Sequence, residues 1–278
     1  NLIPKLFMSC NPAKNWVYTD FYRPHENNEL PKYRKFIQSL VDDNYYISKY
    51  YKTQLQTLDE LSKQRLLHGN WEYDATKDSL IDYNSIINMF TQKGKEGDKY
   101  ISCDVARFGD DRTVIMYWEG LHIKKIRTLL KSAINDVVSE VKQIQQTNGV
   151  PLRNIIIDED GVGGGAKDFL RCQGFVNNSR PLKKENYQNL KTQCFYKLAE
   201  YINTAQIGIT CPDINIKNFI LEELEQIRTK DADKDNKLQI VPKEQIKDIL
   251  GRSPDYADAI MMRMYYEIDS NYGKYFVQ

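Results

Sequence analysis

The sequence has few residues of the kinds that build zinc sites or disulfide frameworks. Its five cysteines include no Cys-x-x-Cys pair, and its three histidines are far apart. Zinc sites usually take thiolate and imidazole ligands at close spacing, and an odd, scattered set of cysteines is typical of reduced proteins. We therefore expect a reduced, intracellular chain without a zinc site.

A strong net charge and long apolar runs are also missing. Lys and Arg number 39 and Asp and Glu 38, which gives a formal net charge of +1. Any basic groove for nucleic acid must therefore come from local clustering. No apolar run is long enough to span a bilayer, and we expect no signal peptide and no membrane partner. The 278 residues suffice for one large domain with an accessory piece.

The patterning divides the chain into three regions. Residues 1–75 combine an apolar, strand-like N-terminal run, which suggests a fragment of a longer protein, with an Asn-Pro turn and two helical stretches. Residues 76–98 end in the polar, glycine-containing run TQKGKEGDK and are the predicted linker. Residues 99–278 begin with three strand-like runs separated by turns, as in an antiparallel meander.

The remainder of this third region alternates between helical and strand patterns. Apolar residues at helical intervals predict helices near 132–146, 187–204, 213–229 and 254–267, and NIIID and KLQIV are strand-like. NIIID reads as a buried strand of the parallel type, and a glycine-rich segment leads from it into another helix. The sequence therefore predicts an α/β domain with three antiparallel strands followed by parallel ones, flanked by helices.

Carboxylates stand at the ends of two predicted strands. Asp104 lies inside the first apolar strand, and Asp158 closes NIIID. If these strands are adjacent and parallel, both side chains emerge at the sheet edge where α/β proteins place their ligands. Asp255 and Asp258 are three residues apart, on one face near the start of the last helix. Several buried acids without basic partners repel one another unless they are protonated or share a divalent cation.

Two other interpretations of these residues stay open. A single aspartate at a strand end or helix start is often only a cap, above all Asp255. The segment GVGGGA formally fits the dinucleotide fingerprint, but the charges of Asp158 and Asp160 would face the phosphates. We favour glycines that let a strand-to-helix turn pass close to a metal-bound phosphate or a DNA backbone.

Three motifs, in this order and spacing, resemble the nuclease domain of the large terminase subunit of tailed bacteriophages or prophages. They are CDVARFGDDRTVIMYWEG, IIIDEDGVGGGAKDFL and LGRSPDYADAIMMRM. Upstream, LFMSCNPAKNWVYTDFY and LDELSKQRLLHGNWEY resemble the end of the terminase ATPase domain. The resemblance covers nearly the whole chain. It implies a ribonuclease H-like nuclease domain over 99–278 and a small remnant of the ATPase domain over 1–75.

The resemblance also implies an activity and its residues. It implies a metal-dependent endonuclease that cuts concatemeric viral DNA during packaging. The family's acids correspond to Asp104, Asp158 and Asp258, while Asp255 and Asp111 are candidates to assist a second ion. Three or four carboxylates can hold two Mg²⁺ or Mn²⁺ ions about 4 Å apart. DNA phosphates would be gripped by basic residues; the candidates are Lys183, Lys184, Lys191, Lys243, Lys247 and Arg252.

By the same resemblance the whole protein works on the portal protein with a small terminase subunit, in the cytoplasm of an infected or lysogenic bacterium. Walker A and Walker B motifs are missing from this sequence, so we expect no ATPase activity and a monomeric fragment. Two alternatives stay open. One is another ribonuclease H-like nuclease, of the junction resolvase or transposase type, and the other is a non-catalytic module of a packaging motor.

Overall fold

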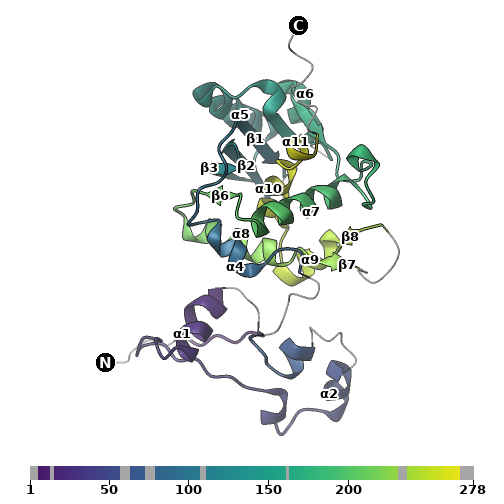
Figure 1. The fold of residues 1–278 in the computed structure, drawn as a ribbon. Coiled ribbons are helices and arrows are strands. Elements are labelled where there is room, and N and C mark those ends of the chain that lie inside the picture. Colours follow the sequence, from purple (N-terminus) through teal and green to yellow (C-terminus); the bar gives the residue numbers. More distant parts are fainter. Residues whose placement is uncertain are drawn as a thin grey trace. The chain divides into compact units, whose positions relative to one another are not determined.

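A computed structural model gives the fold and describes residues 6–12, 16–56, 63–72, 79–106, 111–160, 163–230 and 237–269. The chain divides into two compact units, Asn1–Lys77 and Asp78–Gln278. The second unit carries the sheet and all of the predicted acids (Figure 1). No helix among the described residues is long and apolar enough to cross a membrane.

The second unit is built on a six-stranded mixed sheet in the order β5-β4-β1-β2-β3-β6. Strands β1, β2 and β3 form an antiparallel meander, whereas β4, β5 and β6 join it in parallel. The predicted topology, with three antiparallel strands followed by parallel ones, is therefore confirmed. The strands are β1 (Lys99–Asp104), β2 (Arg112–Glu119), β3 (His122–Leu130), β4 (Ile155–Asp158), β5 (Gln173–Phe175) and β6 (Gly208–Ile209).

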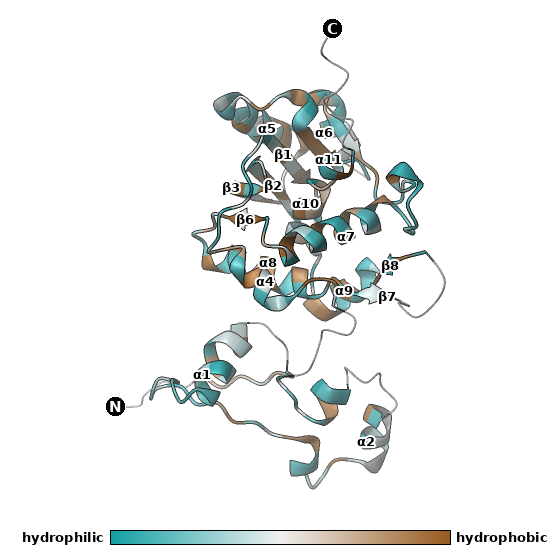
Figure 2. Ribbon diagram, in the orientation of Figure 1, coloured by the Kyte–Doolittle hydropathy of each residue, from teal (hydrophilic) through white to brown (hydrophobic). Residues whose placement is uncertain are grey.

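Side chains alternate between the two faces of this sheet and build two separate cores. Ile101 and Cys103 of β1 pack in one core with apolar residues of α5 and α6, whereas Met116 and Trp118 of β2 pack in the other. This is the period of two that a strand imposes. Because both faces are covered, the central strands are apolar on both sides (Figure 2).

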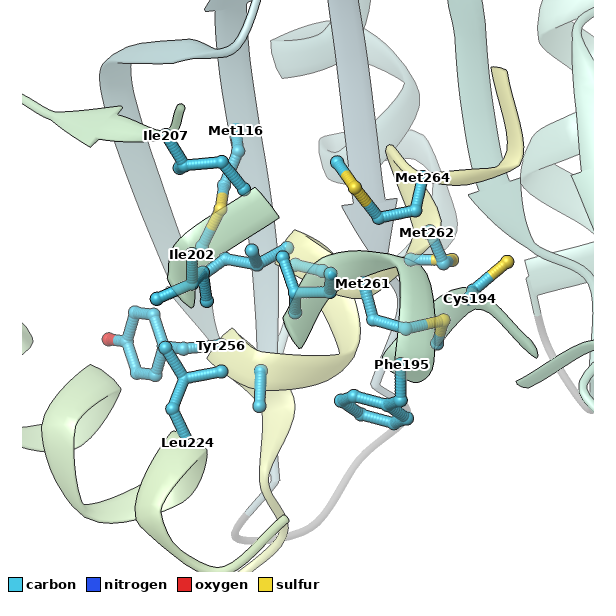
Figure 3. Close-up of a cluster of buried hydrophobic side chains, with 14 of the residues drawn as sticks. Met116, Cys194, Phe195, Ile202, Ile207, Leu224, Tyr256, Met261, Met262 and Met264 are labelled. Carbon is cyan, nitrogen blue, oxygen red and sulfur yellow. The ribbon is translucent and has the colours of Figure 1, made fainter. Parts of the chain in front are cut away.

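Helices cover the two faces unequally. The smaller core lies under α5 and α6, and the larger core collects apolar side chains from α4, α7, α8 and α10. Figure 3 shows part of the larger core, where Met116 lies among residues of α7, α8 and α10. The helices are α4 (Tyr83–Asn88), α5 (Ile134–Asn148), α6 (Gly163–Leu170), α7 (Leu190–Asn203), α8 (Ile214–Glu225), α9 (Lys243–Leu250), α10 (Asp255–Met262) and α11 (Tyr265–Ile268). Short 3₁₀ turns, η5 (Leu152–Asn154) and η6 (Leu182–Lys184), precede β4 and α7.

Three predicted elements differ from the structure in their extent or in their partner. The helix predicted over 213–229 ends at Glu225, because Thr229–Lys230 form β7 and pair with β8 (Gln239–Ile240). The strand-like KLQIV therefore contributes to this separate hairpin and not to the main sheet. The helix predicted over 254–267 is interrupted between α10 and α11.

Residues 79–98, predicted to be most of a linker, belong to the second unit. Ile81, Ile86 and Met89 are buried in the larger core, and the side chain of Asp82 caps α4 by accepting a hydrogen bond from the Ser85 amide. The polar stretch after α4 is typical of a linker, and for this reason a linker was predicted. The apolar residues that precede this stretch pack in the larger core and hold the segment against the domain.

The first unit contains short helices and a small aromatic cluster. Tyr22 stacks on Trp71 with ring centroids 5.3 Å apart, and Phe36 packs edge-on against both rings. The predicted N-terminal strand is absent from residues 6–12, where Leu6 and Phe7 are exposed; a strand needs a neighbour to satisfy its backbone. The helical elements are η1 (Tyr18–Tyr22), α1 (Arg23–Glu26), η2 (Val41–Asp43), α2 (Lys49–Gln56) and η3 (Lys63–Leu67).

Candidate active site

The ends of two neighbouring strands bring the first pair of acids together. β1 and β4 are parallel, with Cys103 opposite Ile157. Continuing this register by one residue places Asp104 beside Asp158, at the carboxyl end of both strands. Asp104 is buried and Asp158 is half-buried. The two acids were expected to meet if these strands are adjacent and parallel, and the strands are both.

Helix α10 adds a third acid from above the sheet. Asp258 lies in its first turn and is buried, as is Asp255. Burial, together with the negative charge of Asp258, raises the pKa of Asp104 well above its usual value, although Lys243 opposes this. Burial also raises the pKa of Asp158 to about 6, and the charges of Asp160 and Asp258 add to the rise. The three carboxylates of Asp104, Asp158 and Asp258 therefore form one electrostatically coupled cluster, which we call the acid cluster.

Two lysines hold the carboxylate of Asp258. Lys191 of α7 and Lys243 of α9 each place Nζ 2.7 Å from a different oxygen of Asp258. Burial disfavours the charged carboxylate, but the two ammonium groups outweigh it and lower the pKa of Asp258. The same acids raise the pKa of Lys243 despite its own burial. Asp258 is therefore an ionised carboxylate held by two cations.

Asp255 and Asp111 lie at the edge of this arrangement. Oδ2 of Asp255 accepts a hydrogen bond of 2.7 Å from the backbone N–H of Arg112, which ties the start of α10 to the start of β2. Asp111 is 3.5 Å from Nζ of Lys247. Burial raises the pKa of Asp255, the Arg112 hydrogen bond lowers it, and the charge of Asp111 raises it again. One oxygen of Asp255 is thus engaged by β2, and Asp255 does not cap its own helix in the way that a helix-start aspartate often does.

The donor set of the acid cluster fits a divalent cation. Mg²⁺ and Mn²⁺ prefer carboxylate oxygens, and the charge of Asp258 raises the pKa of Asp104 and of Asp158, so a cation bound between the three acids would relieve repulsion. Among the described residues, no three His, Cys, Asp or Glu side chains, those of the acid cluster included, already lie in an arrangement that could hold a metal ion. Lys191 and Lys243 each contact one oxygen of Asp258, so an ion bound there would share these oxygens with two ammonium groups that repel it.

A glycine allows the backbone to turn sharply beside Asp158. A Cβ added to Gly163, at the start of α6, would stand 1.6 Å from the carbonyl oxygen of Asp158. No side chain can be accommodated there without moving the end of β4. This agrees with the interpretation that the glycines permit a close strand-to-helix turn. Gly161 and Val162 lie outside the described residues.

The residues predicted to contact DNA fall into two groups. Lys191, Lys243 and Lys247 are paired with the acids described above. Arg252 donates to Glu222 and Glu223 of α8, and its guanidinium lies over the ring of Phe219. Lys183 and Lys184 are exposed, in a turn with left-handed backbone angles (φ 56° and 57°). Lys247 is paired with Asp111, whereas the cations at Asp258 are Lys191 and Lys243.

Two residues near the site were missed from the sequence. Nδ2 of Asn177 donates to Oδ2 of Asp160 at 2.7 Å and to Oδ1 of Asp158 at 3.3 Å. Glu223 is fully buried on α8 and accepts a 2.8 Å hydrogen bond from the backbone N–H of Ala257, so that it caps α10 from a neighbouring helix. No local pattern marks either residue, because each role depends on contacts across the fold.

The fold of the second unit matches that of solved nuclease domains. The nuclease domain of the large terminase subunit gp2 of bacterial virus Sf6 superimposes with a TM-score of 0.58 at 19% identity, covering 67% of this chain and 98% of that domain. A mutant of that domain, solved with manganese and β-thujaplicinol, gives a TM-score of 0.57 at 19% identity, and one solved with calcium gives 0.58 at 19%; both match the same shares.

No protein-family profile matches the sequence, and a comparison with curated proteins gives no match. At 19% identity the structural likeness establishes the fold. The predicted ribonuclease H-like architecture is confirmed: a mixed sheet flanked by helices, with the fold of phage large terminase nuclease domains.

Proposed function

We propose that this chain is the C-terminal part of a phage or prophage large terminase subunit, and that its second unit is a metal-dependent DNA endonuclease that cuts concatemeric viral DNA during packaging. The observation that carries the proposal is the acid cluster at the carboxyl edge of a ribonuclease H-like sheet. The order of the three motifs and the fold of the Sf6 nuclease domain support the same assignment.

In this proposal each part of the site has a distinct task. Asp104, Asp158 and Asp258 would hold two Mg²⁺ or Mn²⁺ ions, with Asp255 and Asp111 outside them. Bound there, such ions activate a water molecule for attack on phosphorus and stabilise the leaving oxygen. Asn177 orients Asp158 through its hydrogen bond, and Arg112 fixes Asp255. The lysines at Asp258 keep the acid cluster near neutrality and lie where a DNA phosphate would approach.

The proposal extends to the surroundings of the site. Lys183, Lys184 and Lys191, with Lys243, Lys247 and Arg252, would contact the phosphates of double-stranded DNA. The whole protein would act with a small terminase subunit and the portal, in the cytoplasm of the bacterial host. Because Walker motifs are missing from this sequence, the purified chain should not hydrolyse ATP, and we expect it to be monomeric.

Plasmid cleavage tests the proposal. The purified chain is incubated with supercoiled plasmid and Mg²⁺, Mn²⁺ or EDTA, beside Asp158→Asn and the control Asp168→Asn, an exposed aspartate on α6. We expect metal-dependent nicking and linearisation that Asp158→Asn loses and Asp168→Asn retains. Intact plasmid under all conditions would favour the non-catalytic module, and a preference for four-way junctions over linear duplex would favour a resolvase.

A further inference from the structure

A cavity of about 390 Å³ adjoins the acid cluster. It lies in the second unit between α7 and the segment that runs from β8 into α9, which Figure 1 shows on the same side of the unit. Asp258, Lys191 and Lys243 line one part of it. Its volume is within the range of small-molecule sites, about 300–1,000 Å³, so it can hold a group the size of a nucleotide.

The chemistry of the lining changes away from Asp258. The other walls carry side-chain amides from Asn178, Asn189 and Gln239 and apolar groups from Ile240 and Val241, and Lys230 and Glu244 are the remaining charged side chains of the lining. A nucleotide has the same division, with a charged phosphate at one end and a neutral, flat base that exposes donors, acceptors and apolar faces at the other. Phosphate is matched by lysine ammonium groups, and base edges by Asn and Gln amides.

Part of the amide lining is held in place before any ligand binds. Nδ2 of Asn189 donates to Oδ1 of Asn178 at 3.1 Å, and Oδ1 of Asn189 accepts from the backbone N–H of Thr192. Each of these bonds uses one position of the Asn189 amide, whereas Nδ2 of Asn178 has no bond to another described residue. The side chain of Gln239 likewise has no such bond. These two amides are therefore available to a base.

We propose that this cavity receives one unpaired nucleotide of the DNA strand to be cut, with its base against the amide and apolar walls and its phosphate toward Lys191 and Lys243. This inference rests on the proposed nuclease function and adds a preference to it. Taking a base out of a duplex costs a few kcal/mol, and least where the base is already unpaired. The chain should therefore favour DNA that has an unpaired nucleotide over continuous duplex.

The binding test uses a short fluorescent duplex with one bulged nucleotide and a second duplex in which the bulge is abasic. Both carry the same phosphates, so only the base differs. Measured by anisotropy with EDTA, so that no strand is cut, the wild-type chain should bind the bulge with a base about tenfold more tightly, the value of one good base contact. Equal affinity for the two duplexes would overturn the proposal, as would failure to bind either.

Variants of the cavity wall localise the effect. Gln239→Leu removes an amide at nearly constant size, and Val241→Trp fills the cavity; each should bring the ratio of affinities close to one. Gln146→Leu makes the same change at an exposed residue of α5 and should keep the tenfold ratio. A tenfold ratio that survives both wall variants, with each variant shown to be folded by its thermal transition, would also overturn the proposal.

A second readout separates this inference from the proposed function. 2-Aminopurine at the bulge should change its fluorescence on binding to the wild-type chain and not on binding to Val241→Trp. Metal-dependent plasmid cleavage combined with indifference to the bulged base would leave the nuclease assignment intact and refute the nucleotide site. Loss of cleavage on every DNA would refute the nuclease assignment itself.

Discussion

The strand acids and the helix acid of the site differ in how their charge is managed. Asp104 and Asp158 sit on adjacent strands, and in the described part of the chain neither forms an ion pair with a lysine or arginine; burial and neighbouring carboxylates raise the pKa of both. Asp258 sits on α10, and two ammonium groups lower its pKa. Among the described residues, the two strand acids thus have no cation paired with them, whereas the helix acid has two.

This difference predicts which of the acids would contribute most of the free energy of metal binding. An ion between Asp104 and Asp158 would relieve the repulsion between their carboxylates, whereas an ion at Asp258 would be repelled by the two ammonium groups already there. The strand side should bind first and more tightly. The following predictions test that contrast, from the largest expected effect to the smallest.

The largest effect is expected from Asp104→Asn on cleavage. Removing one carboxylate removes much of the field that holds the ions, and we expect the rate of metal-dependent plasmid cleavage to fall about a thousandfold, equivalent to about 4 kcal/mol. The rate is measured by the loss of supercoiled plasmid. Asp136→Asn, at the start of α5 and away from the acid cluster, is the control. Cleavage within tenfold of wild type would show that Asp104 holds no essential ion.

Stability without metal should respond in opposite directions to the two kinds of acid. Asp258→Asn leaves Lys191 and Lys243 unpaired and should destabilise the chain by about 2 kcal/mol, less than for a fully buried pair because both lysines are partly exposed. Asp104→Asn removes a repelled carboxylate and should be neutral or stabilising by about 1 kcal/mol. Urea unfolding in EDTA measures both, and a loss of similar size in each variant would contradict the contrast.

Lys243→Met should strengthen metal binding. The substitution keeps the length of the side chain but frees one oxygen of Asp258, so the affinity for Ca²⁺, measured by calorimetry, should rise about tenfold, or about 1.4 kcal/mol. Lys197→Met, on the same helix as Lys191 but paired with Glu200, is the control and should leave the affinity unchanged. Unchanged affinity in Lys243→Met would mean that the ion does not use Asp258.

The pH dependence should follow Asp158. Its pKa is raised to about 6 in the folded chain from a model-peptide value of 3.8, so the folded state binds the proton more tightly than the unfolded state. The contribution of Asp158 to the stability of the metal-free chain is therefore fully present below about pH 4 and is lost as the pH rises through about 6.

Ca²⁺ affinity should show the complementary trend, because metal and proton compete for the same oxygens. The affinity should fall as the pH drops below 6, by up to about tenfold per unit where one proton is displaced. Titrations at pH 5, 6 and 7 measure this. Asp158→Asn should reduce the slope to the part that comes from Asp104, and a wild-type affinity that does not vary over this range would remove Asp158 from the ligand set.

Much of the fold, and the placement of Asp104 and Asp158 at neighbouring strand ends, could be predicted from the sequence. Apolar runs with β-branched residues marked β1, β2 and β4, and an aspartate that closes such a run is costly unless it is functional, which singled out Asp104 and Asp158. The 79–98 segment was misjudged as a linker, because its polar end hides the apolar residues that pack before it.

The sequence by itself determined strands β1, β2 and β4, the acids that end β1 and β4, and a close turn at the glycines after β4, because these follow from side-chain periodicity and backbone sterics within a few residues. Only the tertiary structure decided that Lys191 and Lys243 hold Asp258 and that Glu223 caps α10. Those partners come from separate helices. The packing of the helices over the sheet decides which cation lies beside a buried carboxylate. The local sequence around the carboxylate does not predict it.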